Sequence, residues 1–321
     1  MNLFKNLEKK WINDLKVGEQ VDQYFKITGL YKKTKRDGAP YLAMELMDKT
    51  GKMQAKIWDN VESYLKLIRE GEIYRVSGSI NEFMGQKEVK VDKLSNVPAT
   101  TPLHPEDYIE AAPFDTEKTF SQLMSLVNSQ VRNPHLLQLA ELFSQKYRDR
   151  FKQHYGAQKI HHAYVGGLLA HTYSMAQLAA QIADHYQLDK ELLIMGTLFH
   201  DIGKLFEYNT TPAVSPTLEG GLIGHLVLGN NIFLEFKSQI PDFPVKLGIM
   251  LQHLILSHHG EKEFGSPEVP KTPEAYALHV IDQLDSKMKI FAETIQNADS
   301  KQLFSDYIHV LSRRIYLPQE E

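Results

Sequence analysis

Apolar and polar residues alternate along residues 20–95, which is typical of short β-strands with one buried face. Turn signals at Asp37-Gly38 and at residues 48–51 divide the alternation into separate strands. After Trp58 the spacing becomes helical and Gly71 ends it, so one helix is expected before the last two strands. The predicted strands lie within 21–27, 41–46, 53–58, 73–80 and 87–91, and the predicted helix covers 61–68.

The rest of the chain predicts a proline-rich linker and a second domain. Pro98, Pro102, Pro105 and Pro113 prevent a long helix or strand there. From Glu117 onward apolar residues recur at helical spacing, so this part is predicted to be all-helical. Three strands, a helix and two strands are the element order of the five-stranded OB-fold barrel. We therefore expect an OB-fold domain over 1–97, a linker over 98–115 and a helical domain over 116–321.

Length and composition exclude several classes of protein. The 321 residues suffice for two domains, and 42% apolar with 24% charged residues excludes a collagen-like or wholly disordered chain. The absence of cysteine excludes thiol nucleophiles, cysteine zinc fingers and iron–sulfur clusters. The N-terminus lacks the apolar core of a signal peptide, and no run of about 18 apolar residues occurs. We expect a cytoplasmic protein that does not enter a membrane.

Charge divides unevenly between the two predicted domains. Residues 1–97 hold 18 Lys and Arg against 14 Asp and Glu, a net +4, and subtraction from 36 and 40 for the whole chain leaves 18 against 26, or −8, for the remainder. A basic first part can follow a polyanion, whereas an acidic second part would repel one unless cations lay between. On charge alone, ordinary surface variation explains the difference equally well.

Histidines concentrate in the second domain, where 11 of the 14 lie between residues 154 and 279. In the segment 198–204 an apolar helix ends in His200-Asp201, and an adjacent His and Asp among apolar residues need a partner. A divalent cation is such a partner, because imidazole and carboxylate both bind manganese, iron or zinc. Further candidate ligands are His171, His225, His258, His259 and Asp282.

This pattern resembles the HD-domain metal-dependent phosphohydrolases, whose signature is a His, a His-Asp pair and a distant Asp on helices. The resemblance implies a first ion held by His171, His200, Asp201 and Asp282. It also implies a second ion held by His225 and by His258 or His259, with Asp201 bridging the two. Manganese is favoured, and cobalt, iron and zinc are alternatives that the same nitrogen and oxygen ligands accept.

The order of an OB-fold domain, a linker and an HD domain is similar to that of the YhaM-type bacterial 3′-5′ exoribonucleases, over essentially the whole chain. The resemblance implies a metal-dependent exonuclease that converts single-stranded RNA to nucleoside 5′-monophosphates, with single-stranded DNA left open as a second substrate. The alternatives are an HD-type nucleotide or cyclic-nucleotide phosphohydrolase and a non-catalytic RNA-binding adaptor. An OB-fold groove argues against the first, and the intact ligand set argues against the second.

Four side chains receive a catalytic role in this hypothesis. Asp201 is expected to help generate the nucleophile. Lys204, one helical turn beyond His200, is expected to contact a phosphate oxygen, with a role at the helix dipole as the alternative. His161 and His162 are candidates for binding substrate or protonating the leaving 3′-oxygen, with packing as the alternative.

The first domain carries candidate contacts for a nucleic-acid strand. Tyr41 and Trp58 are candidates for stacking on bases, although core packing is the commoner role of a single aromatic residue. The basic candidates for phosphate contact, in a run that is equally typical of a solvated loop, are Lys32, Lys33, Lys35 and Arg36. The predicted partner is single-stranded RNA, no membrane is expected, and homo-oligomerisation stays open.

Overall fold

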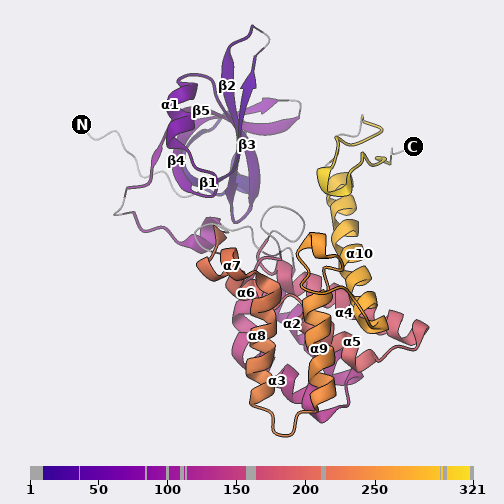
Figure 1. The fold of residues 1–321 in the computed structure, drawn as a ribbon. Coiled ribbons are helices and arrows are strands. Elements are labelled where there is room, and N and C mark those ends of the chain that lie inside the picture. The colour runs from indigo at the N-terminus through magenta and orange to yellow at the C-terminus, as the bar shows by residue number, and fades with distance from the viewer. Residues whose placement is uncertain are drawn as a thin grey trace. The chain divides into compact units, whose positions relative to one another are not determined.

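The computed structural model describes residues 10–35, 37–83, 85–98, 101–108, 112, 114–156, 164–210, 215–296, 298 and 302–318. The chain divides into two compact units, a barrel and a set of helices (Figure 1). Each unit is described by itself.

The first unit is a closed five-stranded barrel with the strand order β1-β2-β3-β5-β4. All neighbouring strands are antiparallel except β3 and β5, which pair in parallel over residues 54–56 and 88–90 and so close the barrel. The predicted OB-fold is confirmed. The elements are η1 (Ile12–Asp14), β1 (Gln20–Thr34), β2 (Pro40–Asp48), β3 (Gly51–Ile57), α1 (Val61–Leu67), β4 (Ile73–Phe83) and β5 (Gln86–Asn96).

Alternate residues of each strand fill the interior of the barrel, as the sequence pattern predicts. Phe25 and Ile27 of β1 and Leu42 and Met44 of β2 are all buried there. Gly78 of β4 lies where the register of β4 and β5 shifts, and a Cβ atom at this position would lie 2.1 Å from the Lys90 carbonyl oxygen. Only glycine lets the two backbones approach so closely.

Part of the proline-rich segment is fastened to the barrel. The 3-10 turn η2 (Pro105–Tyr108) places Asp107 beside Lys49, whose backbone N donates to the Asp107 carbonyl oxygen at 2.9 Å and whose Nζ donates to the carboxylate at 2.9 Å. Tyr108 is only 1% exposed. The predicted linker therefore contains an ordered segment, and the boundaries at residues 97 and 115 stay predictions.

Helices form most of the second unit. Asp115, Asn133 and Asp189 accept hydrogen bonds from the first turns of α2, α3 and α5, which fixes where these helices begin. No helix in the described ranges is long and apolar enough to cross a membrane. The helices are α2 (Thr116–Gln130), α3 (Pro134–Gln153), α4 (Gly167–Tyr186), α5 (Lys190–Phe199), α6 (Lys204–Glu207), α7 (Leu218–Ile223), α8 (His225–Ser238), α9 (Val245–Ser257), η3 (Lys262–Phe264), α10 (Pro273–Gln296) and η4 (His309–Leu311).

Helix α5 lies at the centre of the helical core. Every residue from 192 to 199 is buried, because a helix that is apolar on all sides is stable only when other elements surround it. It packs against α4, α9 and α10. The residues that follow it, His200 and Asp201, are therefore carried into the middle of the unit, where they are 0% and 3% exposed.

One short strand pair interrupts the helices. Strands β6 (Tyr208–Asn209) and β7 (Ser215–Pro216) pair between α6 and α7, and two isolated bridges lie near the end of the chain. Two residues are too few for an alternating pattern, so the sequence did not predict this pair. The second domain is thus mostly helical rather than free of strands, and the predicted fold class is confirmed.

Candidate metal centre

Five elements of the helical unit bring the predicted metal ligands together. His171 lies in the second turn of α4, and His200 and Asp201 directly follow α5. His225 begins α8, His258 and His259 follow α9, and Asp282 lies in the first half of α10. All seven side chains that the sequence pattern singled out are described, and each has a nitrogen or oxygen atom within 4 Å of another member of the group.

The carboxylate of Asp201 is the centre of the group. Its Oδ2 atom lies 3.3 Å from His200 Nε2 and 3.8 Å from His171 Nε2. Its Oδ1 atom lies 3.6 Å from His225 Nε2 and 3.7 Å from His258 Nε2. The two oxygens therefore face two different pairs of histidines, which is the arrangement that a bridging carboxylate requires.

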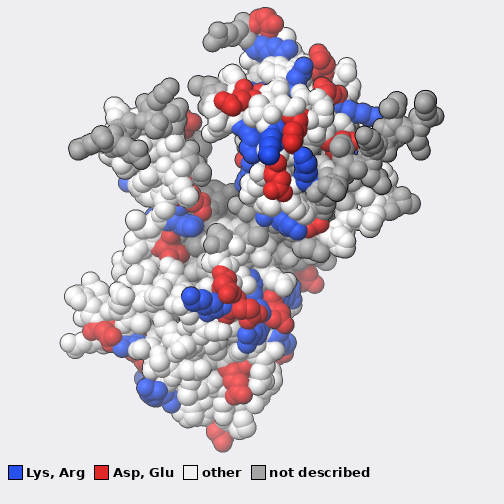
Figure 2. All heavy atoms as spheres, turned by 180° about the vertical axis from the view of Figure 1, so that it is seen from behind, with Lys and Arg blue, Asp and Glu red and all other residues white. Residues whose placement is uncertain are grey.

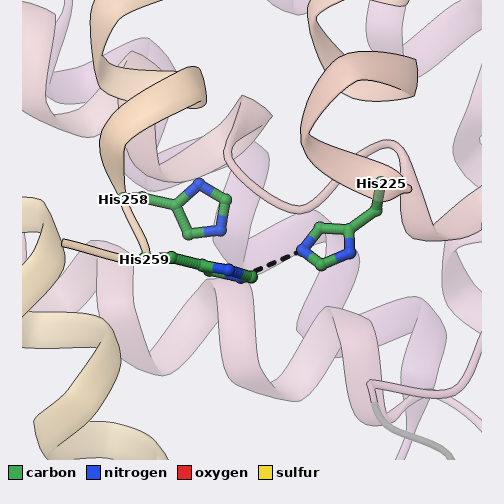
Figure 3. A group of neighbouring side chains, drawn as sticks. All are labelled: His225, His258 and His259. Atoms are coloured by element: carbon green, nitrogen blue, oxygen red, sulfur yellow. Dashed lines mark hydrogen bonds between the residues drawn. The ribbon is translucent and has the colours of Figure 1, made fainter. Parts of the chain in front are cut away.

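Asp282 and His259 complete the two halves of the group. Asp282 Oδ1 lies 3.2 Å from His171 Nε2, on the Oδ2 side of Asp201. On the other side, His259 Nε2 lies 3.1 Å from His225 Nε2 (Figure 3). The structure brings both His258 and His259 to the group, although the sequence pattern required only one of them.

Each of the five histidines is held through its Nδ1 atom. The acceptors are Asp285 Oδ2 for His171 (2.7 Å), the Thr197 carbonyl for His200 (2.7 Å), Glu207 Oε1 for His225 (3.0 Å), the Ile255 carbonyl for His258 (2.7 Å) and the Phe264 carbonyl for His259 (3.0 Å). Because these acceptors need a donor, we assign a proton to each Nδ1 atom. Whenever such a ring is neutral, its Nε2 atom presents a lone pair to the centre, as in histidines that bind metals.

Short distances between Nε2 atoms test whether a cation fits. His171 and His200 Nε2 lie 3.4 Å apart, and His225 and His259 Nε2 lie 3.1 Å apart. Two lone pairs at this distance repel unless a proton or a cation lies between them. Ligand nitrogens about 2.1 Å from one ion lie about 2.9–3.4 Å from each other at octahedral or tetrahedral angles, so the residues present fit divalent metal ions.

The charges of the group are set by burial and by the neighbouring residues. Burial lowers the pKa of His258 to about 4, so this ring is neutral and available as a ligand. Burial also opposes ionisation of Asp201, but the Lys204 ammonium and His200 hold the pKa of the carboxyl well below its usual range. Burial likewise opposes ionisation of Asp282, but its hydrogen bond with His171 holds the pKa of this carboxyl below its usual range. Both carboxylates are therefore ionised at neutral pH.

Lys204 and a small pocket lie beside the two carboxylates. Lys204 Nζ donates to Asp201 Oδ2 at 2.6 Å and to the Gly156 carbonyl oxygen at 2.8 Å. The pocket has a volume of about 180 Å³, and its wall consists of Gly156, His171, Asp201, Lys204, His259, Asp282 and Ser286. The predicted catalytic residues Asp201 and Lys204 thus share this pocket, whereas His161 and His162 lie outside the described residues.

Two acidic residues in contact with the ligands were missed or left undecided by the sequence pattern. Glu207 accepts from both Nδ1 and the backbone N of His225, but the two residues are 18 positions apart and nothing in the sequence links them. Asp285 lies one turn after Asp282, and this spacing was the available signal that it belongs to the site. His279 donates from Nδ1 to the His258 carbonyl oxygen at 2.8 Å and helps to fix the end of α9.

The barrel carries the second group of predicted site residues. Tyr41 and Trp58 stack with ring centroids 4.7 Å apart, and Lys35 Nζ lies 5.0 Å from the centre of the Trp58 ring. Lys33 is exposed, Lys32 is paired with Glu62 at 2.5 Å, and Arg36 lies outside the described residues. On the face that Figure 2 shows, basic and acidic side chains of the barrel are intermixed rather than gathered in one basic patch.

Comparison with known proteins identifies both units. The model of the HD domain matches residues 168–287, and the model of the OB-fold nucleic acid binding domain matches residues 25–97. The chain is 32% identical over 314 residues to the 3′-5′ exoribonuclease YhaM of Listeria monocytogenes, covering 97% of this chain and 98% of that protein. It is 32% identical over 305 residues to the protein of the same name from Bacillus subtilis, covering 94% of this chain and 96% of that protein.

Proposed function

This chain belongs to the YhaM family of 3′-5′ exoribonucleases, and we propose that it releases nucleoside 5′-monophosphates from single-stranded RNA with two divalent metal ions. Membership of the family and the HD domain make the chain a 3′-5′ exoribonuclease. The two ions, their ligands, the single-stranded RNA and the product are the finer parts of the proposal.

One observation carries the proposal, namely that the two oxygens of Asp201 face two separate pairs of imidazole Nε2 atoms. Bound there, the ions would neutralise charge on phosphoryl oxygens and lower the pKa of a water enough to make it a nucleophile at neutral pH. Manganese suits these nitrogen and oxygen ligands and is our first choice. The first ion is assigned to His171, His200, Asp201 and Asp282, and the second to Asp201, His225, His258 and His259.

The residues around the pocket are arranged to hold a phosphate. The Lys204 ammonium has three N–H groups, of which two are used by Asp201 and the Gly156 carbonyl, and among the described residues nothing else accepts from it, so the third is offered to a phosphate oxygen. Lys204 also keeps Asp201 ionised, because its charge opposes protonation of the carboxylate. His161 and His162 stay candidates for protonating the leaving 3′-oxygen.

The wall of the pocket favours an RNA end over a free nucleotide as substrate. Among the described residues the wall is formed by polar side chains and one glycine, and it has no apolar slot for a base. An enzyme that selects a particular nucleotide would need such a slot. Recognition through phosphate and sugar alone suits removal of successive nucleotides of any sequence.

The barrel supports the proposal as the part that retains the strand. OB folds bind single strands by stacking bases on aromatic rings and pairing phosphates with basic groups. Tyr41, Trp58, Lys33 and Lys35 offer both kinds of contact. Lys32 contributes less than the sequence suggested, because Glu62 already neutralises it.

The direct test is digestion of a 5′-labelled single-stranded RNA with the full-length protein and manganese. We expect a ladder that shortens from the 3′ end and nucleoside 5′-monophosphates as products, and no ladder with Asp201→Asn or with a chelator. Release of the labelled nucleotide first would show the opposite polarity. Cleavage inside the strand, or full activity after chelation, would overturn the proposal.

A further inference from the structure

Ser286 lies in the wall of the pocket, and neither the metal centre nor Lys204 uses its side chain. Of the seven wall residues, four are assigned as metal ligands, Lys204 donates to Asp201, and Gly156 accepts from Lys204. The hydroxyl of Ser286 forms no hydrogen bond within the described part of the chain. The pocket wall therefore contains a hydroxyl group that can donate to, and accept from, a bound substrate.

Seven other hydroxyls on helices of this unit bond to their own helix instead. Serine and threonine side chains inside a helix commonly donate to the carbonyl oxygen three or four residues earlier. Thr294, on the same helix as Ser286, donates in this way to the Ile290 carbonyl oxygen at 2.7 Å. The other six are Thr119, Ser121, Ser129, Thr197, Ser238 and Ser257. Ser286 makes no such bond, so its hydroxyl is left for a ligand in the pocket.

The side of α10 that faces the metal centre continues from Asp282 through Ser286 to Lys289. These residues are four and three positions apart, so they lie on one face of a helix with 3.6 residues per turn. Asp285, which holds His171, belongs to the same face. At about 1.5 Å per residue, Lys289 is about 10 Å farther along the helix axis than the ligand Asp282.

A contact with Tyr164 shows in which direction the side chain of Lys289 points. Lys289 Nζ lies 5.9 Å from the centre of the Tyr164 ring. Tyr164 comes three residues before α4, and α4 packs against α10 and supplies His171 to the metal centre. The ammonium is therefore directed toward the start of α4, on the side of α10 that carries the metal centre.

Lys289 has no carboxylate partner among the described residues. Asp285 and Glu293 lie four positions before and after it, a spacing at which ion pairs commonly form on a helix. The two oxygens of Asp285 instead accept from His171 and Ser174, and Glu293 forms no ion pair with Lys289. An ammonium that no carboxylate neutralises attracts a phosphate, even in a helical domain that is acidic as a whole.

We propose that Ser286 and Lys289 bind two successive phosphates of the RNA strand. Ser286 donates to an oxygen of the phosphate that is cleaved, beside Lys204, and Lys289 pairs with the next phosphate. The nucleotide that is removed ends in a 3′-hydroxyl, so this next phosphate lies on the 5′ side, in the strand that remains. The inference rests on the proposed function, because it places both phosphates relative to the proposed ions.

The size of the pocket agrees with this assignment. Its volume of about 180 Å³ is below the roughly 300–1,000 Å³ of sites that enclose a small-molecule ligand. The pocket therefore suits the cleaved phosphate with part of a sugar, and the rest of the strand must lie outside it. The face of α10 leads away from the pocket wall at Ser286 to Lys289, which offers the strand its first contact beyond the pocket.

Cleavage of two short substrates tests the assignment of Lys289. A dinucleotide without a 5′ phosphate contains only the cleaved phosphate, whereas a trinucleotide also contains the next one. With full-length protein and manganese, Lys289→Met should lower the ratio of kcat/KM for the trinucleotide to kcat/KM for the dinucleotide about 5–20-fold. Lys287→Met, an exposed change on the same helix, is the matched control and should keep the wild-type ratio. The wild-type ratio in Lys289→Met would overturn this assignment.

Ser286→Ala tests the contact with the cleaved phosphate. Loss of a hydrogen bond to a charged group should lower kcat/KM for the dinucleotide about 10–100-fold. Ser286→Thr keeps the hydroxyl and should recover part of this loss, which a purely structural role would not explain if both variants unfold at the wild-type temperature. Ser238→Ala, at an exposed position of α8, is the control. Wild-type kcat/KM in Ser286→Ala would overturn the assignment of Ser286.

Binding of a trinucleotide whose terminal linkage is an uncleavable phosphonate separates this inference from the proposed function. For manganese-loaded protein, the slope of log Kd against log salt concentration should flatten by about 0.7 in Lys289→Met and stay unchanged in Lys287→Met. If this difference appeared but wild type released no nucleoside 5′-monophosphate from RNA, the proposed function would be wrong and the phosphate contact of Lys289 would stand. An unchanged slope in Lys289→Met would contradict the contact even in an active enzyme.

Discussion

At the scale of single residues, the acceptors that hold the Nδ1 atoms matter as much as the ligands themselves. Three of the five histidines use backbone carbonyls, which no substitution can remove. The other two use carboxylates, Asp285 for His171 and Glu207 for His225. These two acidic residues orient the rings and are accessible to mutation.

Glu207→Gln tests the orientation of His225. The amide keeps the size of the carboxylate but loses its charge, so His225 is a weaker and less fixed ligand. We expect the manganese concentration for half-maximal activity to rise about 10–100-fold with little change in thermal unfolding. Glu219→Gln, an exposed change on α7, is the control. An unchanged manganese requirement would mean that Glu207 does not support the site.

The protonation of His171 predicts a pH dependence of metal binding. Burial lowers the pKa of this ring, but hydrogen bonds with Asp282 and Asp285 outweigh burial and raise it to about 9. At neutral pH the metal-free protein therefore carries a proton that must leave before Nε2 binds a cation. As pH falls below about 9, manganese affinity should fall by up to about tenfold per unit.

Calorimetric titration of manganese at several pH values between 7 and 9 measures this effect. Asp285→Asn removes one of the groups that raise the pKa, so its affinity should level off at a lower pH than in wild type. The same affinity at every pH would show that no proton is displaced from His171.

At the scale of elements, the start of α8 can pack closely against residues 200–203, which follow α5, because residue 203 is glycine. A Cβ atom on Gly203 would lie 1.9 Å from the His225 carbonyl oxygen and 2.5 Å from the backbone N of Gly229. The backbone at Gly203 is helical, so the constraint is space rather than conformation. The first turn of α8, which carries His225, depends on this contact.

Gly203→Ala should push α8 away from Asp201. We expect a loss of stability of about 1–3 kcal/mol or more and a reduced metal content, since His225 moves with the helix. Gly221→Ala is the matched control, because a Cβ atom there would meet nothing within 4 Å. Thermal unfolding and metal analysis of both variants measure these effects. The same stability and metal content in Gly203→Ala and Gly221→Ala would contradict the packing argument.

Trp58→Ala tests the barrel as the element that retains the strand. Loss of one stacked base costs about 1–3 kcal/mol, so affinity for single-stranded RNA should fall about 5–150-fold. Turnover of a small chromogenic phosphodiester should stay unchanged, because that substrate needs only the metal centre. Tyr186→Ala removes an aromatic residue outside the barrel, 67% exposed on α4, and should leave RNA affinity unchanged. If RNA affinity and turnover of the small phosphodiester fell by the same factor, Trp58 would instead be assigned to the stability of the barrel.

The same elements explain how far the sequence could predict the site. The apolar run of α5 indicated a buried helix, and the structure brings the His200-Asp201 pair at its end together with the other predicted ligands. His258 and His259 could not be separated, because adjacent residues at the end of a helix can both turn toward one point, and both do. Glu207 could not be found, because its contact with His225 depends on how α6 and α8 pack and not on spacing.

At the scale of the whole molecule, the difference in net charge between the two domains agrees with the proposed roles of the barrel in RNA binding and of the helical domain in metal-dependent cleavage. The helical domain with its linker carries a net charge of −8 and the barrel part +4. A polyanion approaching an acidic domain is repelled unless cations lie at the point of contact. The proposed ions would supply that positive charge at the pocket where the phosphate must enter.

Metal content per chain tests the central claim most directly. Purified full-length protein, loaded with manganese and dialysed, should hold two ions per chain by elemental analysis. His225→Ala should hold one, Asp201→Asn fewer than wild type, and His185→Ala, which changes an exposed histidine of α4, should still hold two. A single ion in wild type that His225→Ala leaves in place would contradict the account.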